Sequence, residues 1–360
     1  MIKHNWTKEE ILKIYNKPFM DLMYEAASVH REHHDPNTVQ VSTLLSIKTG
    51  GCPEDCGYCP QAARYHTDLE GNDLMSVPQV KAQALRAKES GSSRVCMGAA
   101  WRNVKDGEEF DNVLEMVRTI NKLEMEVCCT LGMLTENQAQ RLAEAGLYAY
   151  NHNLDSSEEY YKEVISTRGF EDRLKTIDNV RKTNVTVCSG GIIGMGETIE
   201  DRAGMLVALS TLNPQPESVP INALVPVEGT PLAEQQQVPI WDMVRMVATT
   251  RIVMPETQVR LSAGRTQMTR EGQAMCFFAG ANSIFAGDKL LTTPNPDVNE
   301  DMEMFKMLGL IPQKPFVKKS QPESVPAENS KFQNLGEKPK WSRPGHKIER
   351  NLAAQNKQKN

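Results

Sequence analysis

We predict an α/β fold for this chain, and within it a closed (β/α)8 barrel of the TIM type, from three observations. Short runs of β-forming residues alternate with amphipathic helical stretches over residues 38–315, which predicts parallel strands joined by helical crossovers. Eight such runs occur, and a barrel of this type closes with eight strands. Gly146 and Asn184 follow the ends of predicted helices, where helix-ending residues belong. An open, doubly wound sheet is the alternative architecture.

Two segments flank the predicted barrel. An N-terminal helical extension, residues 1–37, contains expected helices at 8–15 and 18–34, and Pro36 ends it. Residues 316–360 hold ten Lys and Arg against four Asp and Glu and lack apolar periodicity, which predicts a basic, polar, disordered tail. The expected strands are residues 39–46, 94–97, 126–130, 149–153, 185–189, 218–223, 258–262 and 283–285. The expected helices of the barrel are residues 77–89, 108–122, 135–145, 170–182, 199–212, 240–253 and 267–279.

The composition excludes several functional classes. With 360 residues and a mean hydropathy of −0.47, the chain can bury a large core but has no apolar run of the ~18 residues that span a bilayer. No charged start followed by an apolar stretch opens the sequence, so we expect no secretory signal and a cytoplasmic protein. A net charge of −5 argues against nucleic acid as the main partner. The eight cysteines predict no disulfide framework, because cytoplasmic thiols stay reduced.

Three of the cysteines lie within eight residues. Cys52, Cys56 and Cys59 follow the first expected strand with the spacing C-x3-C-x2-C. Three thiolates on one loop can bind three corners of a cubane iron–sulfur cluster, which leaves the fourth iron open to a small molecule. A structural zinc site is the alternative, and it needs a fourth ligand, for which His66 is the near candidate.

This spacing resembles the signature of the radical S-adenosylmethionine superfamily. The resemblance implies a [4Fe–4S] cluster on the three cysteines, whose open iron binds S-adenosylmethionine and whose electron cleaves it to a 5′-deoxyadenosyl radical. It also implies that Tyr58 packs near the adenine and that Gly194, in the glycine-rich run 190–197, supports the adenine. The alternative for this run is a turn between a strand and a helix. A P-loop is excluded, because no Gly-Lys-Ser/Thr follows.

Four further residues fall on different expected strands. Cys96, Cys128 and Cys188 lie on the second, third and fifth strands, and Arg260 lies on the seventh. Alternation along each strand sends the polar residues to one face, the barrel lumen, which branched apolar side chains normally fill. Thiols and a guanidinium buried there are unfavourable without ionic partners, and a second metal centre would remove that penalty. The alternative for each cysteine alone is an ordinary buried residue.

The chain is similar to the biotin synthase family within this superfamily, over about residues 38–310. The stretches that carry the similarity are 95–101, 150–155, 187–191, 218–222 and 259–265. The resemblance implies that Cys96, Cys128, Cys188 and Arg260 bind a [2Fe–2S] cluster that donates sulfur.

Two other cysteines have a different expected place. Cys129 directly follows Cys128, and adjacent strand residues face opposite sides, so only one of them can point into the lumen. The family frame, with Leu131 and Gly132 beyond the pair, favours Cys128, so Cys129 would face the surrounding helices. Cys276 lies in an apolar helical stretch and is expected in the core.

A run of amides is the candidate substrate site. Asn151, Asn153 and Asp155 alternate along one expected strand end, so they share one side, and uncharged amides suit a ureido ring. The resemblance assigns Asn153 and Asn222 to the substrate dethiobiotin, and the shared side adds Asn151. The residues implied for S-adenosylmethionine are Tyr58, Ala99, Asn153, Asp155, Arg173 and Gly194, with Trp101 beside Ala99. The alternative for the run is a capping turn before a helix at Ser157.

The activity that the resemblance implies is sulfur insertion between two unactivated carbons of dethiobiotin. No side chain has a pKa high enough to remove a proton from such a carbon, so we expect no catalytic acid or base and assign the chemistry to cofactors. The implied partners are a reducing electron-donor protein of the flavodoxin or ferredoxin type and a second copy of the chain, without nucleic acid or membrane. Three alternatives stay open here: another barrel-type radical enzyme acting on a small amide-containing molecule, a zinc-stabilised binding module, and a sulfur-relay scaffold.

Overall fold

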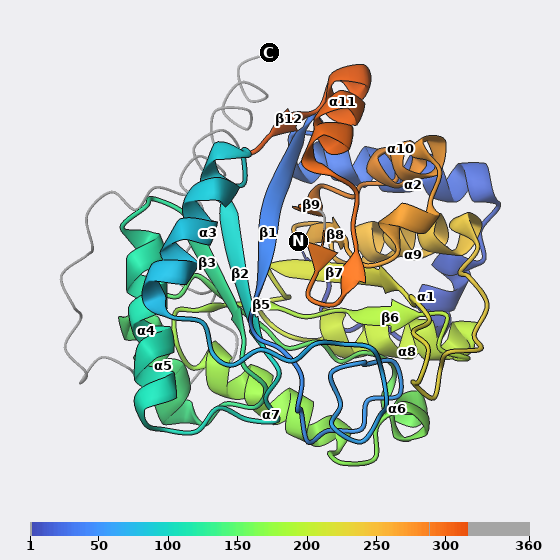
Figure 1. Cartoon of the computed structure of the whole chain (residues 1–360). Coiled ribbons are helices and arrows are strands. Elements are labelled where there is room, and N and C mark those ends of the chain that lie inside the picture. The colour runs from blue at the N-terminus through green and yellow to red at the C-terminus, as the bar shows by residue number, and fades with distance from the viewer. Residues whose placement is uncertain (1, 288, 316–360) are drawn as a thin grey trace.

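Eight parallel strands close into a barrel in the computed structural model, which describes residues 2–287 and 289–315 (Figure 1). They pair in the order β1, β2, β3, β4, β5, β7, β8, β9, and β1 pairs with β9 to complete the ring. Their bounds are β1 Thr38–Lys48, β2 Arg94–Ala99, β3 Glu126–Thr130, β4 Ala149–Asn151, β5 Thr186–Cys188, β7 Ser218–Ala223, β8 Gln258–Leu261 and β9 Ser283–Ala286. The closed barrel is confirmed, and the open doubly wound sheet is excluded.

Helices cover the outside of the barrel (Figure 1). Capping boxes begin several of them: Thr135 accepts a hydrogen bond from the amide of Gln138, and Thr198 from that of Asp201. The helices of the barrel are α3 Val77–Glu89, α4 Glu108–Asn121, α5 Glu136–Glu144, α6 Glu158–Val164, α7 Phe170–Arg181, α8 Ile199–Ser210, α9 Ile240–Val253, α10 Arg270–Phe278 and α11 Val298–Leu308. The N-terminal pair, α1 Lys8–Tyr15 and α2 Phe19–His33, packs against α8 and α9.

Several small elements were not predicted. Strand β6, Gly191–Ile193, pairs with β7, and β10 Lys289–Leu290 forms a hairpin with β11 Thr293–Pro294. A further strand, β12 Ile311–Pro312, pairs with β1. These strands have two or three residues, too few to show a period of apolar residues.

Most predicted elements differ from the structure by one to three residues at an end, among them β4 and α10. Strand β4 ends at Asn151 instead of residue 153, because the chain turns there and reaches a positive φ of 69° at Asp155. The expected helix over 267–279 begins at Arg270, where Thr269 accepts a hydrogen bond from the amide of Gly272, and a 3-10 turn over Arg265–Gln267 precedes it.

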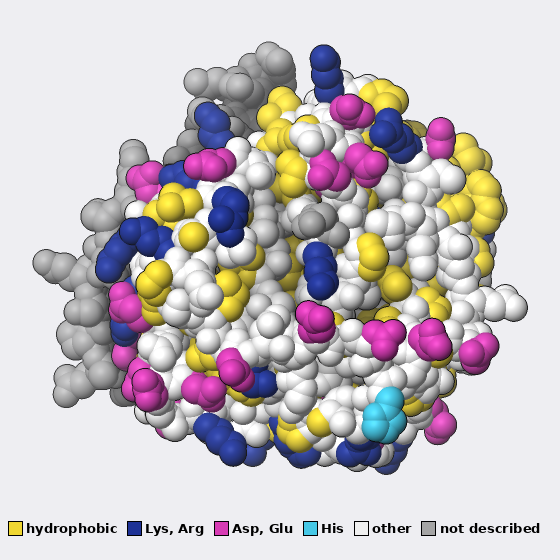
Figure 2. Space-filling view, in the orientation of Figure 1, with side chains coloured by type: hydrophobic (Ala, Val, Ile, Leu, Met, Phe, Trp, Pro, Cys, Tyr) yellow, Lys and Arg dark blue, Asp and Glu magenta, His cyan; other side chains and the backbone are white. Residues whose placement is uncertain are grey.

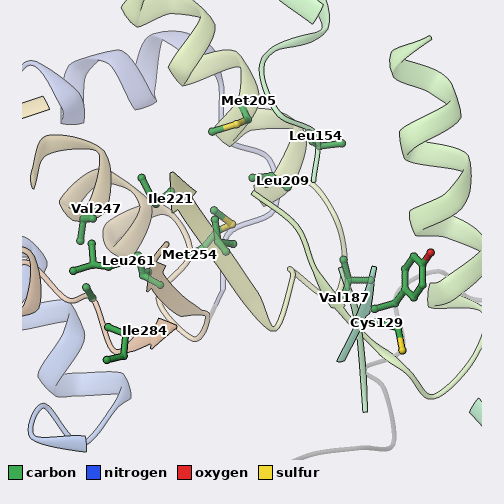
Figure 3. Close-up of a cluster of buried hydrophobic side chains, with 14 of the residues drawn as sticks. Cys129, Leu154, Val187, Met205, Leu209, Ile221, Val247, Met254, Leu261 and Ile284 are labelled. Carbon is green, nitrogen blue, oxygen red and sulfur yellow. The ribbon is translucent and has the colours of Figure 1, made fainter. Parts of the chain in front are cut away.

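The apolar core lies between the strands and the helices, not inside the barrel. Figure 3 shows part of it, where Val187, Ile221, Leu261 and Ile284 project from four neighbouring strands toward the helices. Cys129 belongs to this outer core, as alternation along β3 predicts, and Cys276 is also buried in it. The opposite faces of the same strands are therefore free to carry polar residues into the lumen.

None of the helices within residues 2–287 and 289–315 is long and apolar enough to cross a bilayer. The predicted tail, residues 316–360, lies outside the described residues.

Candidate functional site

A cavity of about 310 Å³ lies at the carboxyl ends of the barrel strands. The three cysteines of the loop after β1, Cys52, Cys56 and Cys59, line it, and so do Cys96 and Cys128 from the barrel strands. The structure thus brings the three loop thiols and two of the three predicted lumen thiols to one cavity, and Cys188 is not among its lining residues.

The loop that carries the first three cysteines is held by the segment between α6 and α7. The Asp55 carboxylate accepts hydrogen bonds from the amides of Ser166, at 2.9 Å, and Thr167, at 3.1 Å. The amide of Gly57 donates to the carbonyl of Val164 at 2.9 Å. Burial raises the pKa of Asp55, but the hydrogen bonds from Ser166 and Thr167 outweigh burial and lower that pKa to about 2. Asp55 therefore stays ionised and fixes the loop against the barrel.

Burial disfavours the thiolate form of all three cysteines of this loop. Burial raises the pKa values of Cys52 and Cys56, and it raises the pKa of Cys59 to about 12. Bound iron would stabilise the thiolates that burial alone disfavours. Within the described residues, no group of three or more His, Cys, Asp or Glu side chains is arranged to hold a single metal ion. In a cubane cluster each thiolate binds a different iron, so its ligands do not converge on one point.

The second group of thiols lies in the lumen. Cys96 and Cys128 are paired across β2 and β3, and Cys188 pairs with Asn151 across β5 and β4. All three are at least 98% buried, and the Cys128 thiol is hydrogen-bonded to both of the others. They form a small cluster with Tyr148, Ala149, Phe285 and Leu290, whose apolar surfaces enclose the thiols.

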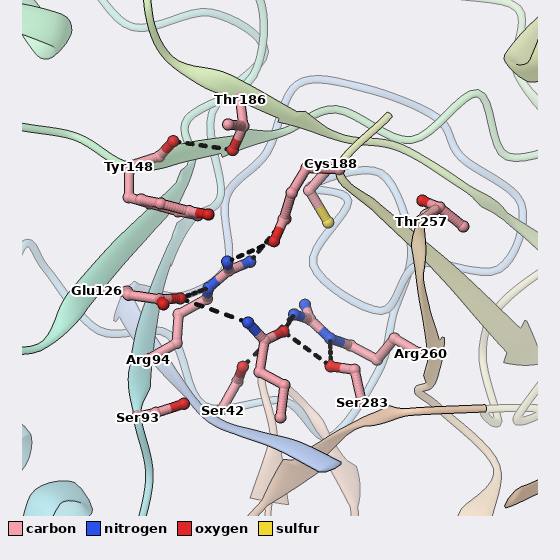
Figure 4. Close-up of polar contacts among 12 residues, drawn as sticks. Ser42, Ser93, Arg94, Glu126, Tyr148, Thr186, Cys188, Thr257, Arg260 and Ser283 are labelled. Carbon is pink, nitrogen blue, oxygen red and sulfur yellow. Dashed lines mark hydrogen bonds and ion pairs between the residues drawn. The ribbon is translucent and has the colours of Figure 1, made fainter. Parts of the chain in front are cut away.

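Arg260 gives this group its charge. In Figure 4 a dashed line joins the Arg260 guanidinium to Ser283, and Cys188 lies above the guanidinium in the view. The hydrogen bond from Cys128 is the first cause that lowers the pKa of Cys188 to about 6, and Arg260 and the Asn151 amide lower it further. The pKa of Cys96 is also lowered: burial raises it, and the hydrogen bond from Cys128 and the charge of Arg260 outweigh burial. The hydrogen bonds to Cys188 and Cys96, together with burial, instead raise the pKa of Cys128 well above its usual value, so the lumen favours thiolates at two of its three cysteines.

A polar network at the floor of the lumen fixes Arg260 (Figure 4). Its Nε donates to the Ser283 hydroxyl at 2.8 Å, and its Nη2 donates to the Gln40 amide oxygen at 2.8 Å. Gln40 in turn donates to Glu126 at 3.4 Å, and Glu126 accepts from Arg94 Nε at 2.8 Å. Arg260 Nη2 also lies 3.5 Å from the Ser42 hydroxyl.

Arg94 is the buried centre of this floor. It is fully buried and forms ion pairs with Glu126 at 2.8 Å and with Glu217 at 3.0 Å. Burial lowers the pKa of Arg94, but Glu217 and Glu126 raise it well above its usual value. Arg94 and Glu126 are buried, whereas the Glu217 side chain is 19% exposed, and the paired charges compensate one another at the floor of the lumen.

The predicted amide residues line the cavity between the two thiol groups. The Asn151 amide nitrogen donates to Asn153 Oδ1 at 3.0 Å and to Cys188 Sγ at 3.3 Å. Asn222 spans β6 and β8: its nitrogen donates to the Gly191 carbonyl at 2.9 Å, and its oxygen accepts from the amide of Ala263 at 3.1 Å. These contacts hold the amides in place at the cavity wall.

Asp155 joins the cysteine loop to the barrel. Its carboxylate accepts from the Tyr58 hydroxyl at 2.9 Å and pairs with Arg173 Nη2. Arg173 Nε also donates to the Tyr161 hydroxyl at 3.0 Å. Tyr58, Asp155 and Arg173 all line the cavity, as do Ala99 and Trp101.

Gly194 has a different place. It does not belong to the cavity lining; its φ is +94°, and a Cβ there would lie 2.3 Å from the Val238 side chain. Its amide donates to the Glu197 carboxylate at 2.9 Å, and Glu197 pairs with Arg202 at 2.8 Å. The glycine-rich run is therefore anchored by its own glutamate, while Ile192 from the same run reaches the cavity.

Sequence reasoning missed other cavity residues. Glu54, His152 and Arg168 line the cavity, as do Leu291, Thr292 and Thr293 from the hairpin region. His152 is buried, and its Nε2 has no hydrogen-bond partner among the described residues. One signal for His152 was available in the sequence, its position between Asn151 and Asn153. The strand alternation that we assumed for this run placed its side chain on the face opposite to the amides.

Two family models match most of the chain. The Radical SAM superfamily model covers residues 46–209, and the Biotin and Thiamin Synthesis associated domain covers residues 220–311. Among curated proteins, biotin synthase of Christiangramia forsetii is 89% identical over 354 residues, 98% of this chain and 98% of that protein. Biotin synthase of Cytophaga hutchinsonii is 65% identical over 315 residues, 88% of this chain and 94% of that protein.

Solved structures share the fold. Methylornithine synthase has a TM-score of 0.72 at 17% identity, over 86% of this chain and 94% of its own. The hydrogenase maturase HydG of Carboxydothermus hydrogenoformans has a TM-score of 0.73 at 17% identity, over 86% of this chain and 76% of its own. At this identity the likeness concerns the barrel alone.

Proposed function

The chain belongs to the biotin synthase family, and from that premise we propose that it inserts sulfur into dethiobiotin to form biotin, using a [4Fe–4S] cluster, a [2Fe–2S] cluster and S-adenosylmethionine. Family membership makes it an iron–sulfur enzyme that uses S-adenosylmethionine. The observation that supports the finer proposal is the shared cavity: the three loop cysteines line it together with Cys96, Cys128 and Arg260 of the lumen, and Cys188 contacts the Asn151 amide at its wall.

The resemblance supplies the proposed ligand sets of the two clusters, and this arrangement supports them. We assign the [4Fe–4S] cluster to Cys52, Cys56 and Cys59, and the [2Fe–2S] cluster to Cys96, Cys128, Cys188 and Arg260. When bound, the first group supplies the electron that cleaves S-adenosylmethionine, and the second supplies the sulfur. The lowered pKa values of Cys96 and Cys188 support the second assignment, because metal ligands bind as thiolates.

The remaining site residues bind and orient S-adenosylmethionine and dethiobiotin. Asp155 and Arg173 offer a carboxylate for ribose hydroxyls and a guanidinium for a carboxylate, the groups that S-adenosylmethionine presents. Asn151, Asn153 and Asn222 offer amide donors and acceptors that match the ureido ring of dethiobiotin. The apolar enclosure by Phe285 and Leu290 keeps water from the lumen, which protects a reactive carbon radical from side reactions.

Two partners complete the proposal. An external electron-donor protein of the flavodoxin or ferredoxin type would reduce the cluster at the cysteine loop, where Cys52 and Cys59 are partly exposed. A homodimer remains a prediction of the resemblance, and equilibrium ultracentrifugation of the loaded protein tests it.

The proposal is tested by deoxyadenosine and biotin measured in the same reaction. Anaerobically reconstituted protein with reductant and S-adenosylmethionine should release deoxyadenosine strongly only when dethiobiotin is added, and biotin should appear with it. Deoxyadenosine formation at the same rate with and without dethiobiotin would contradict the substrate assignment. Cluster transfer to another protein without dethiobiotin-dependent deoxyadenosine would favour a sulfur-relay scaffold.

A further inference from the structure

One buried arginine beside the cysteine loop has no role in the function proposed above. Arg168 lies in the segment between α6 and α7, and its side chain is only 7% exposed. Its Nη2 lies 3.9 Å from Cys56 Sγ, within hydrogen-bond range for sulfur, and its Nη1 lies 3.8 Å from the Glu54 carboxylate. Its Nε is buried without a hydrogen-bond partner among the described residues. Among the described side chains, only Arg168 donates to a thiol of this loop.

The position of Arg168 is fixed by the contacts that hold the loop. The preceding residues, Ser166 and Thr167, bind the Asp55 carboxylate through their amides, and Gly169 begins the first turn of α7. The guanidinium is therefore presented to Cys56 by two anchored backbone segments. Burial lowers the pKa of Arg168 and the charge of Arg173 lowers it too, but the nearby Cys56, Tyr161 and Glu54 raise it above its usual value, so the group stays charged.

A buried positive charge that donates to a ligand sulfur changes the redox property of a cluster. Reduction adds one electron and so adds negative charge at the sulfurs and irons. A nearby guanidinium stabilises that more negative state, and hydrogen bonds to ligand sulfurs and local net charge are the features that set cluster potentials. Glu54, 2% exposed and paired with Arg168, acts in the opposite direction.

We propose that Arg168 is a positioning residue that raises the reduction potential of the [4Fe–4S] cluster through its contact with Cys56, and that Glu54 partly offsets it. The inference rests on the proposed function, since it presupposes a cluster on Cys52, Cys56 and Cys59. Arg168 and Glu54 would thus determine how easily an external one-electron donor reduces the cluster.

Potentiometric titration of the loaded, full-length protein tests the pair. Iron and sulfide are counted first, and the electron paramagnetic resonance signal of the reduced [4Fe–4S] cluster is then followed against potential without S-adenosylmethionine. Arg168→Gln should lower the reduced-to-oxidised ratio at a fixed potential by at least tenfold, a shift of about 59 mV toward negative values for one electron. Arg168→Lys, which keeps the charge, should retain most of the wild-type potential.

Two further variants separate electrostatics from loop distortion. Glu54→Gln keeps the volume of the side chain and should shift the potential in the positive direction, whereas a distorted loop would not produce opposite signs in the two variants. Arg64→Gln is the matched control, because Arg64 lies 3.5 Å from Asp55 on the same loop but is 51% exposed and screened by water. Its shift should be the smallest of the set.

Several outcomes would overturn the inference. An Arg168→Gln protein with full iron content and an unchanged potential, or a shift no larger than that of Arg64→Gln, contradicts it. A shift that appears only with S-adenosylmethionine also contradicts it, since Arg168 would then act on that molecule. If Arg168→Gln does not retain iron, the Glu54→Gln variant decides: a positive shift of its potential supports the inference, and a negative shift or no shift contradicts it. A wild-type protein without a [4Fe–4S] cluster overturns the proposed function as well, whereas a normal cluster that ignores Arg168 overturns the inference alone.

Discussion

The two thiol sites differ in how the chain builds them. The loop site takes Cys52, Cys56 and Cys59 from one short segment, which is held by hydrogen bonds from the segment between α6 and α7. Burial raises the pKa values of all three thiols. The lumen site takes its residues from four strands of a rigid barrel.

The two sites also differ in charge. In the lumen, the hydrogen bonds from Cys128 and then the charge of Arg260 lower the pKa values of Cys96 and Cys188, whereas the pKa of Cys128 itself is raised. A loop can admit a small molecule beside its cluster, whereas a closed lumen can hold a cluster against loss until the reaction consumes it. Under the proposed function, the loop site would bind the exchangeable small molecule and the lumen site would hold the protected cluster.

The largest expected effect comes from Cys188→Ala, which should remove the cluster of the lumen site and leave that of the loop site. Cys188→Ala should retain the absorbance of the [4Fe–4S] cluster and lose the second cluster, so that iron falls from about six to about four per chain. Biotin formation should be abolished. Wild-type yield of biotin from this variant would remove the sulfur-donor role from the lumen site.

Neighbouring cysteines on β3 sharpen the comparison between the lumen and the outer core. Cys128 lies in the lumen cluster, and Cys129 lies in the outer core. Cys128→Ala should abolish the second cluster, while Cys129→Ala should keep about six irons per chain and activity. We expect Cys129→Ala to lower the free energy of unfolding by only ~1 kcal/mol, because a small apolar group is lost. Iron analysis and chemical denaturation measure both, and equal iron loss in the two variants would refute the assignment by strand alternation.

The charged floor of the lumen should matter for stability. Arg94→Met leaves Glu126 and Glu217 without their buried partner, and breaking a buried ion pair in this way costs about 3–5 kcal/mol. Urea denaturation of the metal-free protein measures the loss. Glu136→Gln is a suitable control, because it removes an exposed pair with Lys182, and such pairs contribute about 0–1 kcal/mol. A similar small effect from both substitutions would show that the floor is not rigidly paired.

The anchor of the loop site should have a smaller effect, with a defined pH dependence. Asp55→Asn removes a carboxylate that accepts hydrogen bonds from Ser166 and Thr167, and hydrogen bonds to charged groups contribute about 1.5–3 kcal/mol. Because the folded pKa of Asp55 is lowered to about 2, its stabilisation is fully present above the unfolded pKa of about 4 and is lost as pH falls toward 2. The free energies of unfolding of wild type and variant, from denaturation curves, should therefore converge as the pH falls from about 4 toward 2. A difference that stays constant over this pH range would contradict the role of Asp55 as an anchor.

Much of the fold and part of the site could be predicted from the sequence. Helices α3 and α9 were predicted to the residue, because their apolar periodicity and flanking residues are strong signals. The loop site was visible as spacing, since its ligands are close in the chain. The lumen site was visible only as polar residues on the inner faces of strands, and the resemblance supplied its meaning.

The rest depends on tertiary contacts that a single sequence does not display. Arg168 lies 112 residues from the cysteine that it contacts, and no local pattern marks it. The floor pair of Gln40 and Arg260 spans 220 residues. Asp155 escapes simple alternation because its backbone leaves the extended region at a positive φ. Long-range polar contacts are therefore where the structure adds most.

The most direct test of the account is the iron and sulfide content of the chain before and after a single turnover. The account predicts about six irons per chain at the start, and formation of biotin with loss of the absorbance of the [2Fe–2S] cluster while the [4Fe–4S] cluster persists. Biotin formed by a protein that holds only four irons, or with the [2Fe–2S] absorbance unchanged, would contradict it.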